Sequence, residues 1–204
     1  MRSWTIVAFT LLFSAMATVY ANTAPGQADA GWITLFDGKN LDHWRGDGKA
    51  NFVVEDGSVI AKDKKDPDPK AIAFLISRQS FKDFQLRAEF WISEDGNSGV
   101  FLRVVDANGP ISSKVGYEPN IFDTRPDPSF GTGALLPFAK ALTVLKTGGK
   151  WNTYDITAKG PKFTMLLNGV KTVEGEDSQF PEGPIALQFG QGTVKFRKIE
   201  IRPL

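Results

Sequence analysis

Apolar and polar side chains alternate along most of the chain from Trp32 onward, and this period of two constrains the fold more than any other feature. In residues 83–92 one face carries only apolar side chains, which are Phe84, Leu86, Ala88, Phe90 and Ile92. Successive side chains of a β-strand point to opposite faces, so this pattern predicts a strand with one buried face. The alternation recurs at 98–105, 163–167 and 185–189, and no long amphipathic helix competes with it. The sequence therefore predicts an all-β protein.

Turn signals between the alternating runs indicate how the predicted strands connect. Asn168 and Gly169 form a dipeptide typical of a type I′ turn, which predicts a hairpin between 163–167 and 170–173. The alternation of the last strand changes phase between Phe196 and Ile199, as a β-bulge would require. Shorter strands are predicted at 32–36, 52–55, 58–61, 71–77 and 151–158. About a dozen short strands favour two antiparallel sheets packed face to face, a β-sandwich, in one domain over 31–204.

Two stretches of the chain do not fit the strand pattern. Residues 62–70 (KDKKDPDPK) are too polar for a core and are predicted to form a solvated loop. Residues 124–149 contain three prolines and paired glycines. They form either the walls of a cleft or an irregular connection.

Composition excludes several classes of function. The 204 residues include 24 Lys and Arg and 23 Asp and Glu, so no field of one sign attracts nucleic acid or acidic lipid. The absence of cysteine excludes disulfides, thiolate metal sites and a cysteine nucleophile. His43 is the only histidine, so proton transfer by imidazole depends on that residue alone.

The first residues resemble a secretory signal. Arg2 is followed by an uncharged, mostly apolar run that ends in Val19-Tyr20-Ala21, the spacing of a cleavage site. The run is shorter than the roughly 20 residues of a spanning helix, so a retained membrane anchor is disfavoured. We expect a signal peptide over 1–21, a flexible leader over 22–30, and a periplasmic or cell-surface protein of a bacterium.

Charged side chains in otherwise apolar strands are the first candidates for a functional site. Arg103 lies between Leu102 and Val104 and could present its guanidinium to a sugar oxygen or a carboxylate, or form a surface ion pair. Glu118 and Asp123 are the best carboxylate candidates, although their separation of five places them on opposite faces of a regular strand. They converge only if a bulge intervenes or if Asp123 lies beyond the strand end.

Aromatic and amide side chains are the second group of candidates. Trp44 is either a stacking platform for a pyranose ring or a packing residue. Asn152 and Gln188 alternate with apolar neighbours and suit hydroxyl recognition, because each amide offers an acceptor and two donors. No phosphate-binding loop, zinc-type histidine pair or EF-hand loop occurs.

An ordered set of short motifs resembles one known family. The set begins with GWITLFDGKNL at 31–41, WRG at 44–46 and NSGVFLR at 97–103, and continues with GYE at 116–118, TGAL at 132–135, WN at 151–152, LNG at 167–169, GPIALQ at 183–188 and FRKI at 196–199. Together these motifs resemble the 3-keto-disaccharide hydrolase family. The resemblance covers nearly all of 31–204 and implies a concanavalin A-like jelly roll.

The resemblance also implies a reaction. A C3 carbonyl acidifies the C2 proton of a sugar, so a base can form an enolate that expels the C1 substituent, after which water adds. On this reading Glu118 is the base, Arg103 stabilises the enolate and Asp123 orients groups or returns the proton. The substrate-binding residues it implies are Trp44, Arg45, Asn97, Asn152 and Gln188. A divalent cation replaces Arg103 as electrophile if the two carboxylates converge on it.

One position departs from the family pattern. Asn120 stands where members commonly carry Gln, and Pro119 precedes it. Asn is shorter by one methylene, so a direct contact to substrate would become water-mediated or be lost. Two hypotheses remain open: an exported hydrolase or lyase of 3-keto glycosides, and a non-catalytic carbohydrate-binding module, since this fold serves both classes.

Overall fold

The computed structural model describes residue 1 and residues 31–68 and 70–204. Residues 31–204 form one compact unit. The predicted signal peptide at 1–21, apart from residue 1, and the predicted leader at 22–30 lie outside the described residues. Among the described residues no helix has the length and hydrophobicity needed to cross a membrane.

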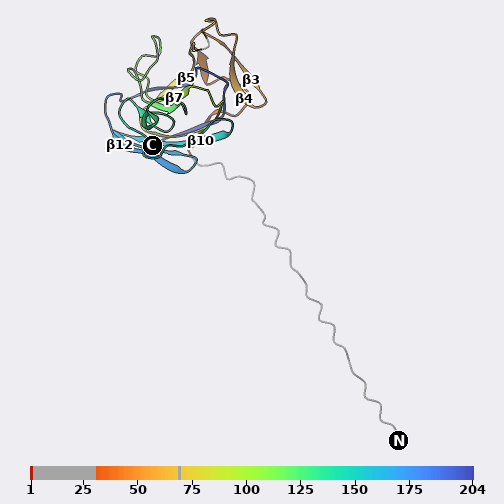
Figure 1. Ribbon diagram of the computed structural model, residues 1–204. Helices are drawn as coiled ribbons and strands as arrows, with labels where there is room; N and C mark the ends of the chain where they lie inside the picture. Colours follow the sequence, from red (N-terminus) through yellow and green to blue (C-terminus); the bar gives the residue numbers. More distant parts are fainter. Residues whose placement is uncertain (2–30, 69) are drawn as a thin grey trace. The chain divides into compact units, whose positions relative to one another are not determined.

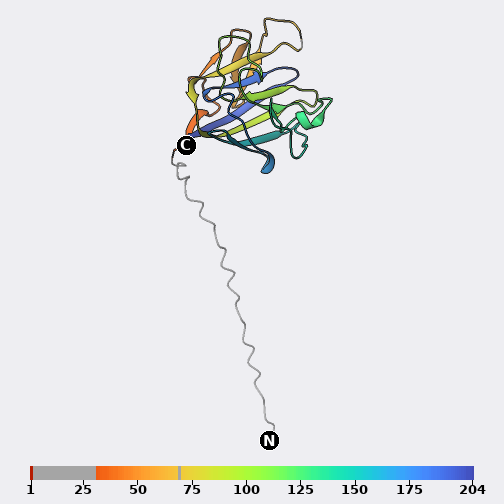
Figure 2. The ribbon, with the colours of Figure 1, turned by 90° about the vertical axis from the view of Figure 1, so that its left-hand side faces the viewer.

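The described strands form two antiparallel sheets, which confirms the predicted β-sandwich. The larger sheet contains, in spatial order, β12 (Val170–Glu176), β11 (Lys162–Leu167), β10 (Trp151–Lys159), β6 (Phe84–Ile92), β14 (Val194–Pro203), β4 (Ser58–Lys62) and β3 (Asn51–Glu55), with β1 (Ile33–Phe36) paired to β14. The smaller sheet contains β2 (Trp44–Gly46), β5 (Ala73–Phe81), β13 (Gly183–Phe189), β7 (Ser98–Phe101), β8 (Glu118–Ile121) and β9 (Leu135–Leu136). Figure 1 shows β5 and β7 in one layer and β10 and β12 in the other, and Figure 2 shows the same layers turned by 90°.

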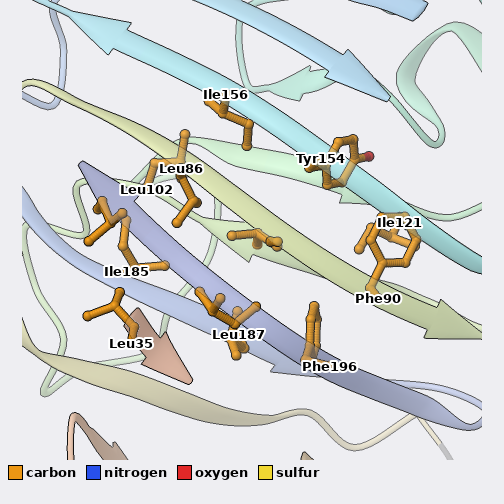
Figure 3. Packing of buried hydrophobic residues seen from close by; sticks show 14 of the residues in the cluster. Leu35, Leu86, Phe90, Leu102, Ile121, Tyr154, Ile156, Ile185, Leu187 and Phe196 are labelled. Atoms are coloured by element: carbon orange, nitrogen blue, oxygen red, sulfur yellow. The ribbon is translucent and has the colours of Figure 1, made fainter. Parts of the chain in front are cut away.

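The core lies between the two inner faces. Figure 3 shows it packed from side chains of both sheets, including Leu86, Phe90 and Phe196 from the larger sheet and Ile121 and Leu187 from the smaller one. The alternation along β6 is strict, with every second residue buried from Phe84 to Ile92. Period two therefore predicted this strand because one of its faces packs against the other sheet while the opposite face meets water.

Both predicted backbone irregularities are present. Asn168 and Gly169 have φ values of 52° and 79°, the positive values that a type I′ hairpin turn requires at both central positions. The register of β14 against β6 shifts between Arg197 and Ile199, and Lys198 has a φ of 47°. The predicted hairpin and bulge are confirmed.

A second hydrophobic cluster covers the outer face of the smaller sheet, which is the face directed away from the larger sheet. It consists of Phe74, Ile76, Phe101, Val104 and Ala186, packed against Ala107, Ile111 and Val115 of the connection from β7 to β8. That connection therefore folds over the sheet and covers part of the outer face.

One tyrosine bonds the two sheets together beside β8. The hydroxyl of Tyr154, on β10, donates to the carbonyl oxygen of Asn120 at 2.6 Å and accepts from the Gly133 backbone N–H at 3.1 Å. Tyr154 is fully buried, and burial raises the pKa of its hydroxyl far above the ordinary value. The neutral phenol therefore donates and accepts at once and fixes β8 against the larger sheet.

Candidate functional site

Glu118 is the first residue of β8 and lies on the outer face of the smaller sheet. The register that pairs Gly99 with Asn120 continues to place Glu118 opposite Phe101. The Glu118 side chain lies across Gly99, since a Cβ atom at Gly99 would come 3.0 Å from both Cγ and Oε1 of Glu118. Glycine at this position leaves room for the carboxyl group on the sheet surface.

The carboxyl group of Glu118 is electrostatically unusual. The residue is partly buried, and its carboxyl group accepts no hydrogen bond from any other described residue. Burial raises the pKa of Glu118 to about 7, against the attraction of the Arg125 guanidinium, which lowers it. A carboxyl group that titrates near neutral pH and has no other hydrogen bond is suited to accept a proton from a substrate.

Arg125 is the cation that acts on Glu118, and the sequence reasoning missed it. It lies in the connection from β8 to the 3-10 helix η1 (Pro128–Phe130), where it is partly buried. Its side chain makes no hydrogen bond or ion pair to another described residue, so its guanidinium donors are available. The only signal in the sequence is that Arg125 is the first cation that follows Glu118 along the chain.

Arg103 does not occupy the predicted position beside Glu118. Its guanidinium is buried and donates to the carbonyl oxygens of Lys82 at 2.7 Å and Gly160 at 2.9 Å, and to Asp83 Oδ1 at 3.3 Å. The cause is local, because Arg103 has a φ of 52°, which ends the alternation that predicted its direction. Strand β7 accordingly ends at Phe101, not at residue 105. The proposed enolate-stabilising role therefore does not fit Arg103, whose side chain connects three segments of backbone.

Asp123 is also held by hydrogen bonds within the protein. Its Oδ1 accepts from the hydroxyls of Thr132 and Thr147, and its Oδ2 accepts from the backbone N–H groups of Thr147 and Gly148. Burial acts to raise the pKa of Asp123, but these hydrogen bonds outweigh it and lower the pKa. Asp123 lies beyond the end of β8, as one of the two alternatives required, but its charge organises the 124–149 connection and is not free to return a proton.

Trp44 does not fit the predicted role of a sugar-stacking platform. Its side chain is 2% exposed and its indole N–H donates to the Leu35 carbonyl oxygen at 2.7 Å. Trp44 is therefore a packing residue, the alternative left open by its residue type. The neighbouring Arg45 is partly buried, and its Nη2 donates to the Ala107 carbonyl oxygen at 3.0 Å.

The predicted amide side chains separate into two groups. Asn152 is buried, donates to the carbonyl oxygens of Thr147 and Lys150, and accepts from Asn168, so it stabilises a strand end. Gln188 lies on the outer face, and its buried Oε1 has no hydrogen-bond partner among the described residues. Of the predicted amides, Gln188 therefore retains a group suited to a ligand.

Asn97 lies just before β7, and Asn120 lies within β8. Asn97 is partly buried in the connection that precedes β7. Asn120 is buried, and its Nδ2 donates to the Phe130 carbonyl oxygen at 2.7 Å. Asn120, which stands where family members commonly carry Gln, therefore joins β8 to the 3-10 helix η1 within the protein.

The two predicted carboxylates do not form a cation site with other ligands. Across residues 31–68 and 70–204, no group of three or more His, Cys, Asp or Glu side chains is arranged to hold a metal ion. The candidate site thus consists of Glu118 over Gly99, the Arg125 cation and the unpaired Gln188 acceptor.

Solved structures share the fold of this chain. A glycosyl hydrolase described as putative from Parabacteroides distasonis matches with a TM-score of 0.71 at 20% identity, over 85% of this chain and 94% of that one. The carbohydrate-binding module CBM66 from Bacillus subtilis matches with a TM-score of 0.60 at 19% identity, over 78% and 95% of the two chains. These similarities confirm the lectin-like jelly roll.

Sequence comparison identifies the family. A 3-keto-disaccharide hydrolase from Bacteroides thetaiotaomicron is 38% identical over an alignment of 89 residues; the match covers 38% of this chain and only 28% of that relative. The model of the 3-keto-α-glucoside-1,2-lyase-like domain matches residues 31–202, nearly the whole described unit. The chain therefore belongs to the 3-keto-α-glucoside-1,2-lyase-like family, as its ordered motifs predicted.

Proposed function

We propose that this protein cleaves 3-keto glycosides by removing the C2 proton with Glu118. The observation that carries the proposal is the Glu118 carboxyl group, which lies on an outer sheet face without a hydrogen bond from the described residues and has a pKa of about 7. Membership of the family and the sugar-related names of its relatives support a carbohydrate substrate.

The proposed reaction has two steps. In the first, the Glu118 carboxylate takes the C2 proton, the C2–H electron pair forms the enolate of the C3 ketone, and collapse of the enolate breaks the C1–O bond. The leaving oxygen takes up the proton that Glu118 holds, which restores the carboxylate and gives a free aglycone and a sugar with a C1=C2 double bond conjugated to the ketone. In the second step, water adds its oxygen to C1 and its proton to C2, which restores the 3-keto sugar.

Arg125 replaces Arg103 in this proposal as the group that stabilises negative charge. Its guanidinium acts on Glu118 and has no other hydrogen bond or ion pair to the described residues. A cation beside the developing enolate oxygen stabilises the transition state most strongly when the site is partly shielded from water. Asp123 serves only to position the connection that carries Arg125.

The test compares 3-ketomaltose with maltose as substrates of the purified chain, with glucose release as the readout. We expect release from the ketone only, and a loss of at least about 100-fold in kcat for Glu118→Gln. Glu182→Gln, at an exposed carboxylate immediately before β13, is the matched control and should retain full activity. Release from maltose, or full activity of Glu118→Gln, would refute the proposed reaction.

A non-catalytic carbohydrate-binding module is the second candidate. It is favoured by the placement of Arg103 and Asp123, because only one of the three predicted catalytic side chains lies free on the outer face. Calorimetric titration with 3-ketomaltose that shows binding without glucose release would select this function.

Export to the periplasm or cell surface is part of the same proposal and rests on the sequence of residues 1–21. Mass spectrometry of the protein from its native cells would test it, since cleavage is expected after Ala21.

A further inference from the structure

Lys64 carries a partly buried charge that no described carboxylate balances. It lies in the connection from β4 to β5. Its ammonium group donates to the carbonyl oxygens of Ala71, at 3.0 Å, and Gly190, and makes no ion pair with a described residue. Burial lowers the pKa of Lys64, and no neighbouring carboxylate offsets this effect. A charge shielded from water is ordinarily paired, so this ammonium group indicates a place for an anion.

Three hydrogen bonds hold this connection against the rest of the protein. Two of them run from Lys64 to Ala71, just before β5, and to Gly190, just after β13. The third runs from the Lys65 backbone N–H to the Lys49 carbonyl oxygen at 2.9 Å. It places Lys65 beside Lys49, which lies just before β3. Hydrogen bonds to the backbone therefore bring these lysines together.

A cavity of about 450 Å³ lies beside these contacts. Its lining among the described residues contains four cations, which are Lys49, Lys64, Lys65 and Lys70. Asp66 is the one carboxylate in that lining, and its Oδ1 already accepts from the Asp68 backbone N–H at 3.0 Å. Ile72 and two alanines form an apolar part of the wall. A concave surface with an excess of one charge and apolar walls concentrates counter-ions.

The protein itself neutralises these lysines only in part. The side chains of Lys65 and Lys70 have no hydrogen bond or ion pair with a described residue. Lys49 Nζ lies 3.9 Å from Asp47 Oδ2, which is beyond hydrogen-bond distance. Asp66 and the more distant Asp47 therefore leave an excess of positive charge along the cavity wall. Like charges around one cavity repel one another, and a bound anion removes this cost.

The lysines favour one kind of anion. Each presents a compact charge with rotatable donors, whereas a carboxylate is bound best by the planar fork of an arginine. Ammonium groups from several directions suit the oxygens of a tetrahedral sulfate or phosphate group. The cavity volume lies in the usual range for sites of small organic molecules, so it accommodates an ester of such a group as well as the free ion.

We propose that the cavity lined by Lys49, Lys64, Lys65 and Lys70 binds a sulfate or phosphate group. The Lys64 ammonium group has three N–H donors, of which carbonyl oxygens of the protein use two, and its third donates to an oxygen of the anion. The other three lysines stabilise the charge of the anion. The site does not depend on the reaction proposed at Glu118.

The test is calorimetric titration of the purified chain with inorganic phosphate, inorganic sulfate and glycerol 3-phosphate, with glycerol as the uncharged probe. We expect an anion to bind and glycerol not to bind at the same concentration. Lys64→Met should weaken anion binding at least about tenfold, as the loss of a charge-assisted hydrogen bond requires. Lys65→Gln and Lys70→Gln remove exposed side chains without hydrogen bonds and should each weaken binding about threefold.

The matched control is Lys159→Gln, at an exposed lysine that ends β10 in the other sheet, and this variant should bind the anion as the wild type does. If Lys64→Met does not fold, Lys65→Gln and Lys70→Gln decide the question. Tighter binding of glycerol 3-phosphate than of inorganic phosphate assigns the site to an ester, and the reverse assigns it to the free ion.

Two results would overturn the site: failure of all three anions to bind, and anion binding that none of the three lysine variants in the cavity weakens. None of these measurements uses turnover of a 3-keto glycoside. A failure of the proposed function therefore leaves the test of this site unchanged.

Discussion

The side chain of Glu118 fills the space that Gly99 leaves on β7. A Cβ atom at Gly99 would lie 3.0 Å from Glu118 Cγ and Oε1, which is tighter than ordinary van der Waals contact. The catalytic role proposed for Glu118 thus depends on the absence of a side chain on the neighbouring strand.

Gly99→Ala should displace the Glu118 carboxyl group and lower kcat on 3-ketomaltose by about tenfold, since a misplacement of about 1 Å is costly for proton transfer. The φ of Gly99 is not in the left-handed region, so alanine strains only the contact with its neighbours. A double-mutant cycle checks the cause. Gly99→Ala should lower the free energy of unfolding of the wild type, but it should not do so in the Glu118→Ala background. A cost that persists there would point to another neighbour.

The activity should depend on the protonation of Glu118. Because its pKa is about 7, kcat/KM should rise as the pH increases through 7 and then level off, since only the carboxylate accepts a proton. A profile that is flat between pH 5 and 9 would contradict the assignment.

The same group makes stability depend on pH. The folded state holds a proton on Glu118 that the unfolded chain releases near its ordinary pKa, so stability is greatest below that value and falls as the pH rises to about 7. Glu118→Gln should therefore raise the free energy of unfolding by about 2 kcal/mol at pH 8, after allowance for its partial exposure, and by nothing at pH 4. Urea denaturation at the two pH values measures the difference.

Arg125→Met should move the activity profile to higher pH. Removal of the cation removes the influence that lowers the pKa of Glu118, so the carboxylate forms at higher pH. The variant should also lose at least about tenfold in kcat through weaker stabilisation of the enolate. Arg125→Lys keeps the charge and should restore the pH profile, which distinguishes an electrostatic role from a purely structural one.

Arg103→Met should destabilise the fold. The change removes the guanidinium donor of the Lys82 and Gly160 carbonyl oxygens and the ion pair of Asp83, which keeps only the Gly160 backbone N–H. Each buried acceptor left unpaired costs about 1–3 kcal/mol. Thermal unfolding should show the loss directly. An unchanged melting temperature with reduced turnover would instead indicate that Arg103 takes part in the reaction.

The strands were predictable because their pattern reflects packing. Every second residue of β6 enters the core, and the turn at Asn168 and Gly169 uses residue types that tolerate positive φ. Glu118 was predictable as a candidate because a carboxylate in an apolar strand is uncommon, and the structure places it on the outer face.

The residues around Glu118 were predicted less accurately, because their positions depend on features that the period-two pattern does not determine. The positive φ of Arg103 redirects a side chain that period two had placed on a strand face. Trp44 offers a ring that suits either a sugar or a core, and only the tertiary structure decides between them. Arg125 reaches Glu118 through the path of an irregular connection, which no local pattern specifies.

The Tyr154 hydroxyl determines how the protein can respond to a substrate. Since it joins the backbone at Asn120 and Gly133 to the opposite layer, the strand that begins with Glu118 cannot shift as a hinged element without breaking a buried polar contact. In the proposed reaction the sugar therefore adapts to a base held in advance, and the layer that takes no part in the chemistry supplies the rigidity.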